Sequence, residues 1–86
     1  MGLETVELVL AWEEEFHIEI TDADAEKCPT PRDVCDLVER KLASERRPEE
    51  RSEIDRLVKL ITLEMTGIKD AEFSFDARFI EDLGID

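Results

Sequence analysis

The chain has 86 residues, a hydrophobic fraction of 42% and a formal net charge of -13. This length allows one small domain, and the apolar content is sufficient for a folded core despite the charge. The excess of acidic residues argues against nucleic acid and anionic membranes as partners and favours a protein partner with a basic surface.

Residues 3–16 predict an amphipathic helix around which the chain is organised. Apolar residues recur there at the three- and four-residue spacing of a helix. They are Leu3, Val6, Val9, Leu10 and Phe16, with Leu8 and Trp12 widening the same face. Five glutamates occupy much of the remaining surface. We expect Trp12 to be only partly buried because of its size.

A connector with Ile18 and Ile20 as apolar anchors leads to a short second helix. Thr21 and Asp24 have the spacing of a capping box at its start, and the helix should run to about Cys28.

The next helix has the strongest start signal in the chain. Thr30 is a typical N-cap, Pro31 fits the first helical position, and Asp33 supplies a carboxylate at the third. The helix should run to about Ser44 and bury one apolar face. That face consists of Val34, Leu37, Val38 and Leu42.

Residues 45–51 form a charged, hydrophilic joint before the last long helix. We expect Ser52 to cap this helix and Gly67 to end it in a left-handed conformation. Its apolar face is predicted to be Ile54, Leu57, Val58, Ile61 and Met65.

Residues 68–86 predict a long loop. One helical turn over residues 77–83 should direct Phe79, Ile80 and Leu83 inward, with Gly84 closing it. The predicted fold is therefore all-α: a small bundle of three longer helices and one short helix, with a long loop, in a single domain over residues 1–86.

The charges are distributed unevenly along the chain. Residues 1–26 hold nine acidic residues and no basic one, whereas Arg40–Arg56 holds six of the eleven basic residues. We therefore expect an acidic pole and a pole of mixed charge.

The sequence offers little for catalysis or metal binding. Cys28 and Cys35 lack further ligands at zinc-site spacing and are interpreted as small buried apolar residues. His17 has no nucleophile at a recognisable spacing. The acidic run that begins at Asp22 has Lys27 where a calcium loop needs glycine, so we predict no metal site. The expected compartment is the reducing cytoplasm.

Read as two pieces, the chain resembles the acyl carrier protein family with the pieces in reversed order. Residues 3–16, followed by Glu19-Ile20 and Ala25-Glu26-Lys27, look like the family's second and third helices, and residues 30–42 like its fourth. The family's first helix and first loop are similar to residues 54–67 and 79–86. Residues 1–45 thus resemble the family's C-terminal half and residues 52–86 its N-terminal half, with residues 46–51 as linker.

In the family, a sequence like Gly84-Ile85-Asp86 runs into a serine that carries 4′-phosphopantetheine, and then into the equivalent of Leu3. The resemblance places Gly2 at the serine position, flanked by Asp86 and Leu3. Glycine has no hydroxyl group, so we expect no prosthetic group on this chain. This order of the halves fits a circular permutation whose ends lie at the attachment site. It also fits a sequence that spans the boundary between two tandem carrier domains.

The resemblance also gives roles to surface and interior residues. The acids that match the family's partner-binding positions are Glu7, Glu13, Glu14, Asp22 and Glu26. They would dock on basic surfaces of acyl-transfer, synthase or phosphopantetheinyl-transferase enzymes, or else form a solvated face. The residues that match the acyl pocket, or else form plain core, are Val6, Leu10, Phe16, Cys28, Val34 and Phe79.

Three hypotheses follow. The first is an acyl-carrier-like domain of fatty-acid or polyketide-type thioester pathways, a monomer that partner enzymes recognise but that does not itself carry the arm. The second is an interaction or assembly protein in which two chains exchange halves. The third, an enzyme, lacks a nucleophile–base pair, a phosphate loop and a metal cluster in the sequence, and we predict that the chain is not one.

Overall fold

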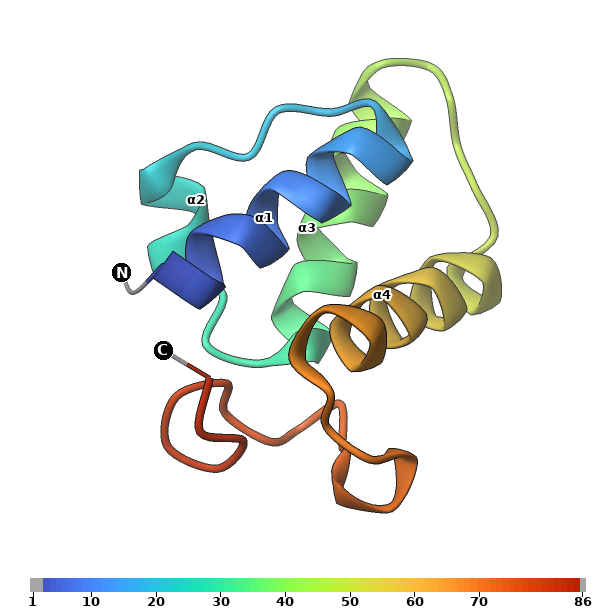
Figure 1. The fold of residues 1–86 in the computed structure, drawn as a ribbon. Coiled ribbons are helices and arrows are strands. Elements are labelled where there is room, and N and C mark those ends of the chain that lie inside the picture. Colours follow the sequence, from blue (N-terminus) through green and yellow to red (C-terminus); the bar gives the residue numbers. More distant parts are fainter. Residues whose placement is uncertain (1–2, 86) are drawn as a thin grey trace.

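The structure is a computed structural model that describes residues 3–85, in which the regular elements are helices (Figure 1). They are α1 (Leu3–Phe16), α2 (Asp22–Glu26), α3 (Pro31–Ser44), α4 (Arg51–Thr66) and the short 3-10 helix η1 (Asp70–Glu72). Three longer helices, one short helix and a long C-terminal segment were predicted, and this all-α arrangement is confirmed. The turn at η1 was not predicted.

Side-chain caps define the starts of α2 and α3. Thr21 and Asp24 form a reciprocal capping box at α2, and Thr30 and Asp33 form a second one at α3, where Pro31 takes the first position. Each box satisfies backbone N–H groups that have no partner within the helix. Both predicted starts are confirmed because they depend only on residues close in sequence.

Two predicted helix boundaries differ from the structure by two residues each. The helix α2 ends at Glu26 rather than near Cys28. The N-cap of α4 is Glu50, in extended geometry and without a side-chain cap hydrogen bond, whereas Ser52 lies inside the first turn. Gly67 ends α4 with a φ of 75°, a left-handed conformation that favours glycine, as predicted.

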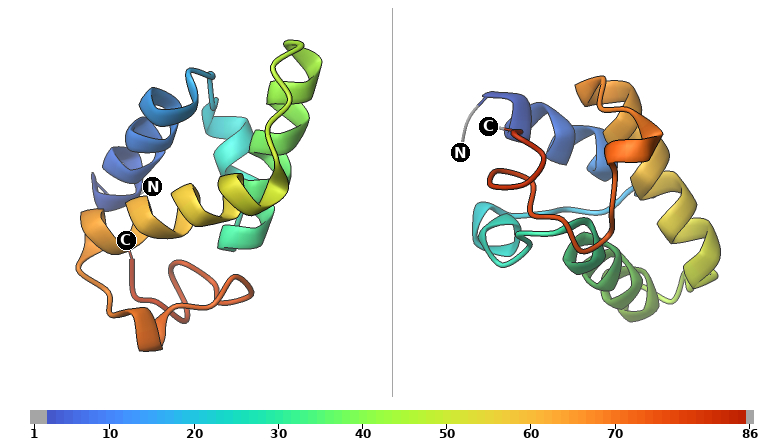
Figure 2. Two further views of the ribbon diagram at one scale, coloured as in Figure 1. Left: turned by 90° about the vertical axis from the view of Figure 1, so that its right-hand side faces the viewer. Right: turned by 90° about the horizontal axis from the view of Figure 1, so that it is seen from below.

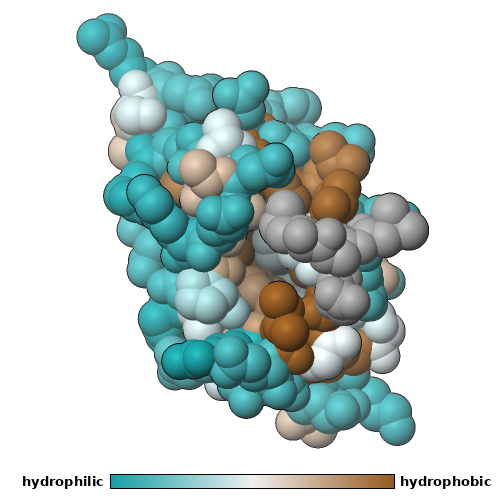
Figure 3. All heavy atoms as spheres, turned by 90° about the vertical axis from the view of Figure 1, so that its left-hand side faces the viewer, coloured by the Kyte–Doolittle hydropathy of each residue, from teal (hydrophilic) through white to brown (hydrophobic). Residues whose placement is uncertain are grey.

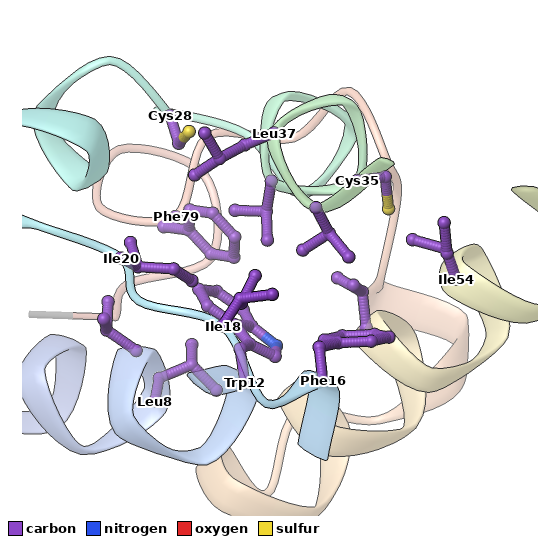
Figure 4. Packing of buried hydrophobic residues seen from close by; sticks show 14 of the residues in the cluster. Leu8, Trp12, Phe16, Ile18, Ile20, Cys28, Cys35, Leu37, Ile54 and Phe79 are labelled. Atoms are coloured by element: carbon purple, nitrogen blue, oxygen red, sulfur yellow. The ribbon is translucent and has the colours of Figure 1, made fainter. Parts of the chain in front are cut away.

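The core forms around one face of α1. Leu8, Trp12 and Phe16, spaced four residues apart, are each at most 5% exposed. They point toward the connector, α3 and α4, and the tilted rings of Trp12 and Phe79 have centroids 5.7 Å apart (Figure 4). The prediction that Trp12 is only partly buried is wrong, because elements from both ends of the chain cover it.

Four side chains predicted to face the core lie at the surface instead. Val6 and Leu10 on α1 are 38% and 51% exposed, Met65 on α4 is 44% exposed, and Ile80 is 62% exposed. On α1 the buried face is centred on Leu8 and Trp12, and a helix turns by about 100° per residue, so Leu10 falls on the opposite side. The face where α1 begins is accordingly hydrophilic with separate hydrophobic patches (Figure 3).

The C-terminal segment closes the core from below α1 and α3. The backbone N–H of Phe79 donates to the Pro29 carbonyl at 2.9 Å, and the N–H of Arg32 donates to the Phe75 carbonyl at 2.9 Å. Phe79 and Ile85 are 7% and 2% exposed, so both are core residues. The two ends of the described chain, the start of α1 and the end of this segment, lie side by side in all three views (Figures 1 and 2).

Arg51 fixes the start of α4 against α3. Its guanidinium bonds to Asp36 at 2.7 Å and Glu39 at 3.0 Å on α3, and to Asp55 at 2.7 Å on α4 itself. These carboxylates hold the pKa of Arg51 above its usual range, chiefly through the hydrogen bond with Asp55. A fork-shaped guanidinium that bridges three carboxylates orients the two helices as well as attracting them.

We predict that two leucine-to-alanine substitutions on α1 will differ strongly in their effect. Leu8→Ala removes a side chain that is 1% exposed, and it should lower the free energy of unfolding by about 2–5 kcal/mol. Leu10→Ala, at a half-exposed position, should cost less than about 1 kcal/mol. Urea unfolding followed by circular dichroism measures both. Equal costs would contradict the orientation of α1.

Candidate functional site

The predicted partner-binding acids lie on the outer surfaces of α1 and α2. Glu7 and Glu14 are exposed on α1, and Asp22 and Glu26 are exposed on α2. The side chains of these four residues make no hydrogen bond or ion pair within residues 3–85. Their carboxylates therefore stand free toward solvent, where a cationic partner could contact them.

Glu13 differs from the other predicted acids because it has a structural partner. Its Oε2 accepts a hydrogen bond at 2.8 Å from the backbone N–H of Ile20, and the residue is only partly exposed. Ile20 itself is 7% exposed. Glu13 thus holds the connector in place so that Ile18 and Ile20 enter the core, which leaves one of its oxygens for any other contact.

Ion pairing divides the molecule into the two expected poles. Among the acids of residues 3–26, Asp24 alone is in an ion pair, with Lys41 at 3.1 Å. The basic residues Arg47, Arg51 and Arg56 instead pair with carboxylates of residues 36–55. Negative charge on α1 and α2 is therefore mostly uncompensated, and it will attract basic surfaces over about a Debye length.

Asp24 supports the local fold rather than the free acidic surface. The hydrogen bond from Lys41, followed by that from the Thr21 N–H, holds the pKa of Asp24 below its usual range. The pair links α2 to α3 across the surface. Because both partners of this pair remain accessible to water, its contribution to stability is small.

A small apolar cavity of about 30 Å³ lies beneath α1. Its walls include Thr5, Trp12, Cys28, Phe79 and Ile85. The volume is about that of one water molecule in the liquid, so side chains fill the interior almost completely. Within residues 3–85 the buried Trp12 indole N–H and Thr5 hydroxyl have no hydrogen-bond partner, which costs free energy of folding.

The predicted interior residues divide into two groups. Phe16, Cys28, Val34 and Phe79 are buried, and all of these except Phe16 line the small cavity. Val6 and Leu10 are exposed and do not line it, so their assignment to the core is wrong. Ile85, which was not predicted, lines the cavity and is 2% exposed.

Both cysteines behave as small apolar residues, as predicted. Burial raises the pKa of the Cys28 thiol to about 11 and that of the Cys35 thiol to about 12. Because the thiolate is the nucleophilic form, neither residue is activated for chemistry at neutral pH.

The predicted attachment position, Gly2, and its neighbour Asp86 lie outside the described residues, and the other neighbour, Leu3, is the first residue of α1. Within residues 3–85, no cluster of three or more His, Cys, Asp or Glu side chains could hold a metal ion. In the same range, no helix is both long and apolar enough to cross a membrane.

We predict that Glu13 and its neighbour Glu14 will differ in their effect on stability. Glu13→Ala leaves the Ile20 N–H without its acceptor and should lower the free energy of unfolding by about 1–3 kcal/mol. Glu13→Gln keeps an acceptor oxygen and should cost clearly less, and Glu14→Ala should change stability by less than about 0.5 kcal/mol. Urea titrations of the three variants provide the test. Similar values for Glu13→Ala and Glu14→Ala would refute a tethering role.

Comparison with known proteins gives two informative relatives. The chain is 50% identical over 43 residues to the acyl carrier protein of Thermosynechococcus vestitus, a match that covers 50% of this chain and 53% of the relative. It is 56% identical over 40 residues to the acyl carrier protein of Bdellovibrio bacteriovorus, covering 46% of this chain and 51% of the relative. The chain thus spans about half the length of the curated relatives it matches.

No protein-family model matches the chain. No solved structure matches it significantly. Both relatives are named as carriers, the class that the sequence analysis favoured over enzymes. On a match over about half of its length, the chain is acyl-carrier-protein-like.

Proposed function

We propose that this chain is an acyl-carrier-like domain of fatty-acid or polyketide-type thioester pathways, working in the cytoplasm. The observation that carries the proposal is the identity of 50–56% to two acyl carrier proteins over about half of the chain. The unpaired acids on α1 and α2 support it, because they form a surface suited to basic partner enzymes.

We further propose that the helix order is permuted within a single domain. Residues 1–45 correspond to the family's C-terminal half, residues 46–51 to a linker and residues 52–86 to its N-terminal half. Packing of α4 against α1 and α3, and of Ile85 near Leu8 around one cavity, supports this assignment. Permutation is best tolerated where the two ends lie together at the surface.

In the proposed arrangement Gly2 takes the position of the family's attachment serine. Attachment of 4′-phosphopantetheine requires a side-chain hydroxyl whose oxygen forms the phosphodiester, and glycine has none. The chain would therefore present the carrier surface to partner enzymes without carrying the arm. Phe16, Cys28, Val34 and Phe79 then serve as core, a role that the near-complete filling of the interior supports.

Recognition is proposed to depend on Glu7, Glu14, Asp22 and Glu26, with Glu13 contributing through its free oxygen. Exposed charges of this kind mainly accelerate association and make it dependent on salt. Basic residues of a transferase or synthase would approach across the outer surface of α1. Long-range attraction is favoured because few bases compensate the acids of residues 3–26.

Incubation of the whole chain with a phosphopantetheinyl transferase and coenzyme A tests whether the chain can accept the 4′-phosphopantetheine arm. Intact mass spectrometry should show no mass increase on the natural chain, because Gly2 lacks the reacting oxygen. Gly2→Ser restores a hydroxyl and should gain the mass of one arm. A gain of that mass by the natural chain, at any residue, would contradict the proposal.

Recognition of the acidic surface by the transferase can be measured on the Gly2→Ser chain, which has a hydroxyl group to modify. Adding Glu7→Gln and Glu14→Gln should lower kcat/KM several-fold at low salt, and the difference should shrink as salt screens the charges. Glu72→Gln, at an exposed acid of η1 that has no side-chain partner within residues 3–85, is the control away from α1 and should have little effect. If all three substitutions reduce the rate equally, net charge rather than the α1 surface governs recognition.

A second candidate function is assembly through exchange of halves between two chains. The observation that favours it is the joint between α3 and α4, residues 45–50, which is exposed at every position. In an exchanged dimer, residues 51–85 of one chain would complete residues 3–44 of another. Light scattering that finds a monomer at every concentration would exclude this candidate.

A further inference from the structure

In the structure, the joint between α3 and α4 consists of residues 45–50. Its path decides whether the α4 that packs on α1 and α3 belongs to the same chain or to a second copy of it. It leaves the end of α3, runs outside the helices and turns back to the start of α4 (Figures 1 and 2). Contacts between the two parts of the chain, such as Trp12 with Phe79 and Asp36 with Arg51, would be the same if both parts came from different copies. The choice between a closed monomer and a dimer with exchanged halves therefore depends on the joint.

Arg47 is the residue of the joint that reaches back to the first part of its own chain. Its Nη2 donates to the His17 carbonyl at 2.7 Å, and its Nη1 donates to the Phe16 carbonyl at 3.2 Å. The same guanidinium pairs with Glu45 at 2.8 Å, and the Arg47 backbone N–H donates to the Leu42 carbonyl at 2.8 Å. Arg47 thus joins the C-terminal ends of α1 and α3.

These contacts are favourable for physical reasons. The last carbonyl groups of a helix lack partners within the helix and carry partial negative charge, so a cation there stabilises the end of α1. Hydrogen bonds from a charged donor are stronger than those between neutral groups. A joint that extends straight from the end of α3 toward a second copy carries Arg47 away from the end of α1 and gives these bonds up.

We infer that Arg47 keeps the chain monomeric by holding the joint folded back on its own first half. The inference concerns the exchange of halves, and it stands whether or not acyl-transfer enzymes recognise the chain. An equilibrium between two arrangements shifts only through contacts that differ between them, and the Arg47 side-chain bonds are such contacts.

The neighbouring Arg46 provides a matched control. It lies in the same joint and is exposed, and its side chain makes no hydrogen bond or ion pair within residues 3–85. Its φ of 60° is left-handed, and glutamine would occupy that conformation with the same difficulty. Arg46→Gln therefore removes the same charge as Arg47→Gln but leaves the bonds to Phe16 and His17 intact.

The experiment refolds each full-length variant from urea over a range of protein concentrations and measures the dimer fraction by light scattering. Arg47→Gln should raise the dimerisation constant about 100-fold. Loss of the Arg47 bonds should disfavour the closed monomer about tenfold, and two closed monomers are consumed for each exchanged dimer. Arg46→Gln should match the natural chain. Arg47→Lys keeps the charge but has a single ammonium instead of the fork, and it should give an intermediate value.

Isotope-filtered NMR on a mixture of labelled and unlabelled chains then identifies the contacts in the dimer. Exchange predicts a contact between Trp12 of one chain and Phe79 of the other. The inference is overturned if Arg47→Gln forms no more dimer than Arg46→Gln, if its dimer lacks that cross-chain contact, or if the natural chain is already exchanged. Should Arg47→Gln not refold, a dimer fraction for Arg47→Lys equal to that of the natural chain overturns it.

Discussion

Burial of one face of α1 is the constraint on which the rest of the structure depends. Leu8, Trp12 and Phe16 form this face, and no single neighbouring element covers it. The connector, α3 and α4 cover part, and the C-terminal segment supplies Phe79 and Ile85. The first and last parts of the chain are therefore needed together for a dry core, which explains why the described ends lie side by side.

The distribution of ion pairs connects this fold to the proposed function. Arg51 bridges α3 and α4, and Arg47 links the joint to α1, so much of the positive charge is used to hold the helices together. The acids on α1 and α2 receive little of it. A chain with a formal net charge of -13 thus gains a strongly acidic surface on the same helix that organises the core.

The sequence was most informative where structure depends on near neighbours. The caps at Thr21 and Thr30 and the left-handed Gly67 follow from local hydrogen bonding and backbone sterics. The orientation of α1 could not be predicted, because its apolar residues surround the helix and only the packed neighbours select Leu8 over Leu10. Ile85 and the tether from Glu13 to Ile20 were missed for the same reason, since each depends on a contact made in the folded chain.

The central claim is that both ends of one chain enclose the same face of α1. Nuclear Overhauser effects in a sample shown to be monomeric test it most directly. Leu8 and Ile85 line one small cavity, so contacts between their methyl groups are expected, together with contacts between the Trp12 and Phe79 rings. A folded monomer in which both sets of contacts are absent would contradict the account.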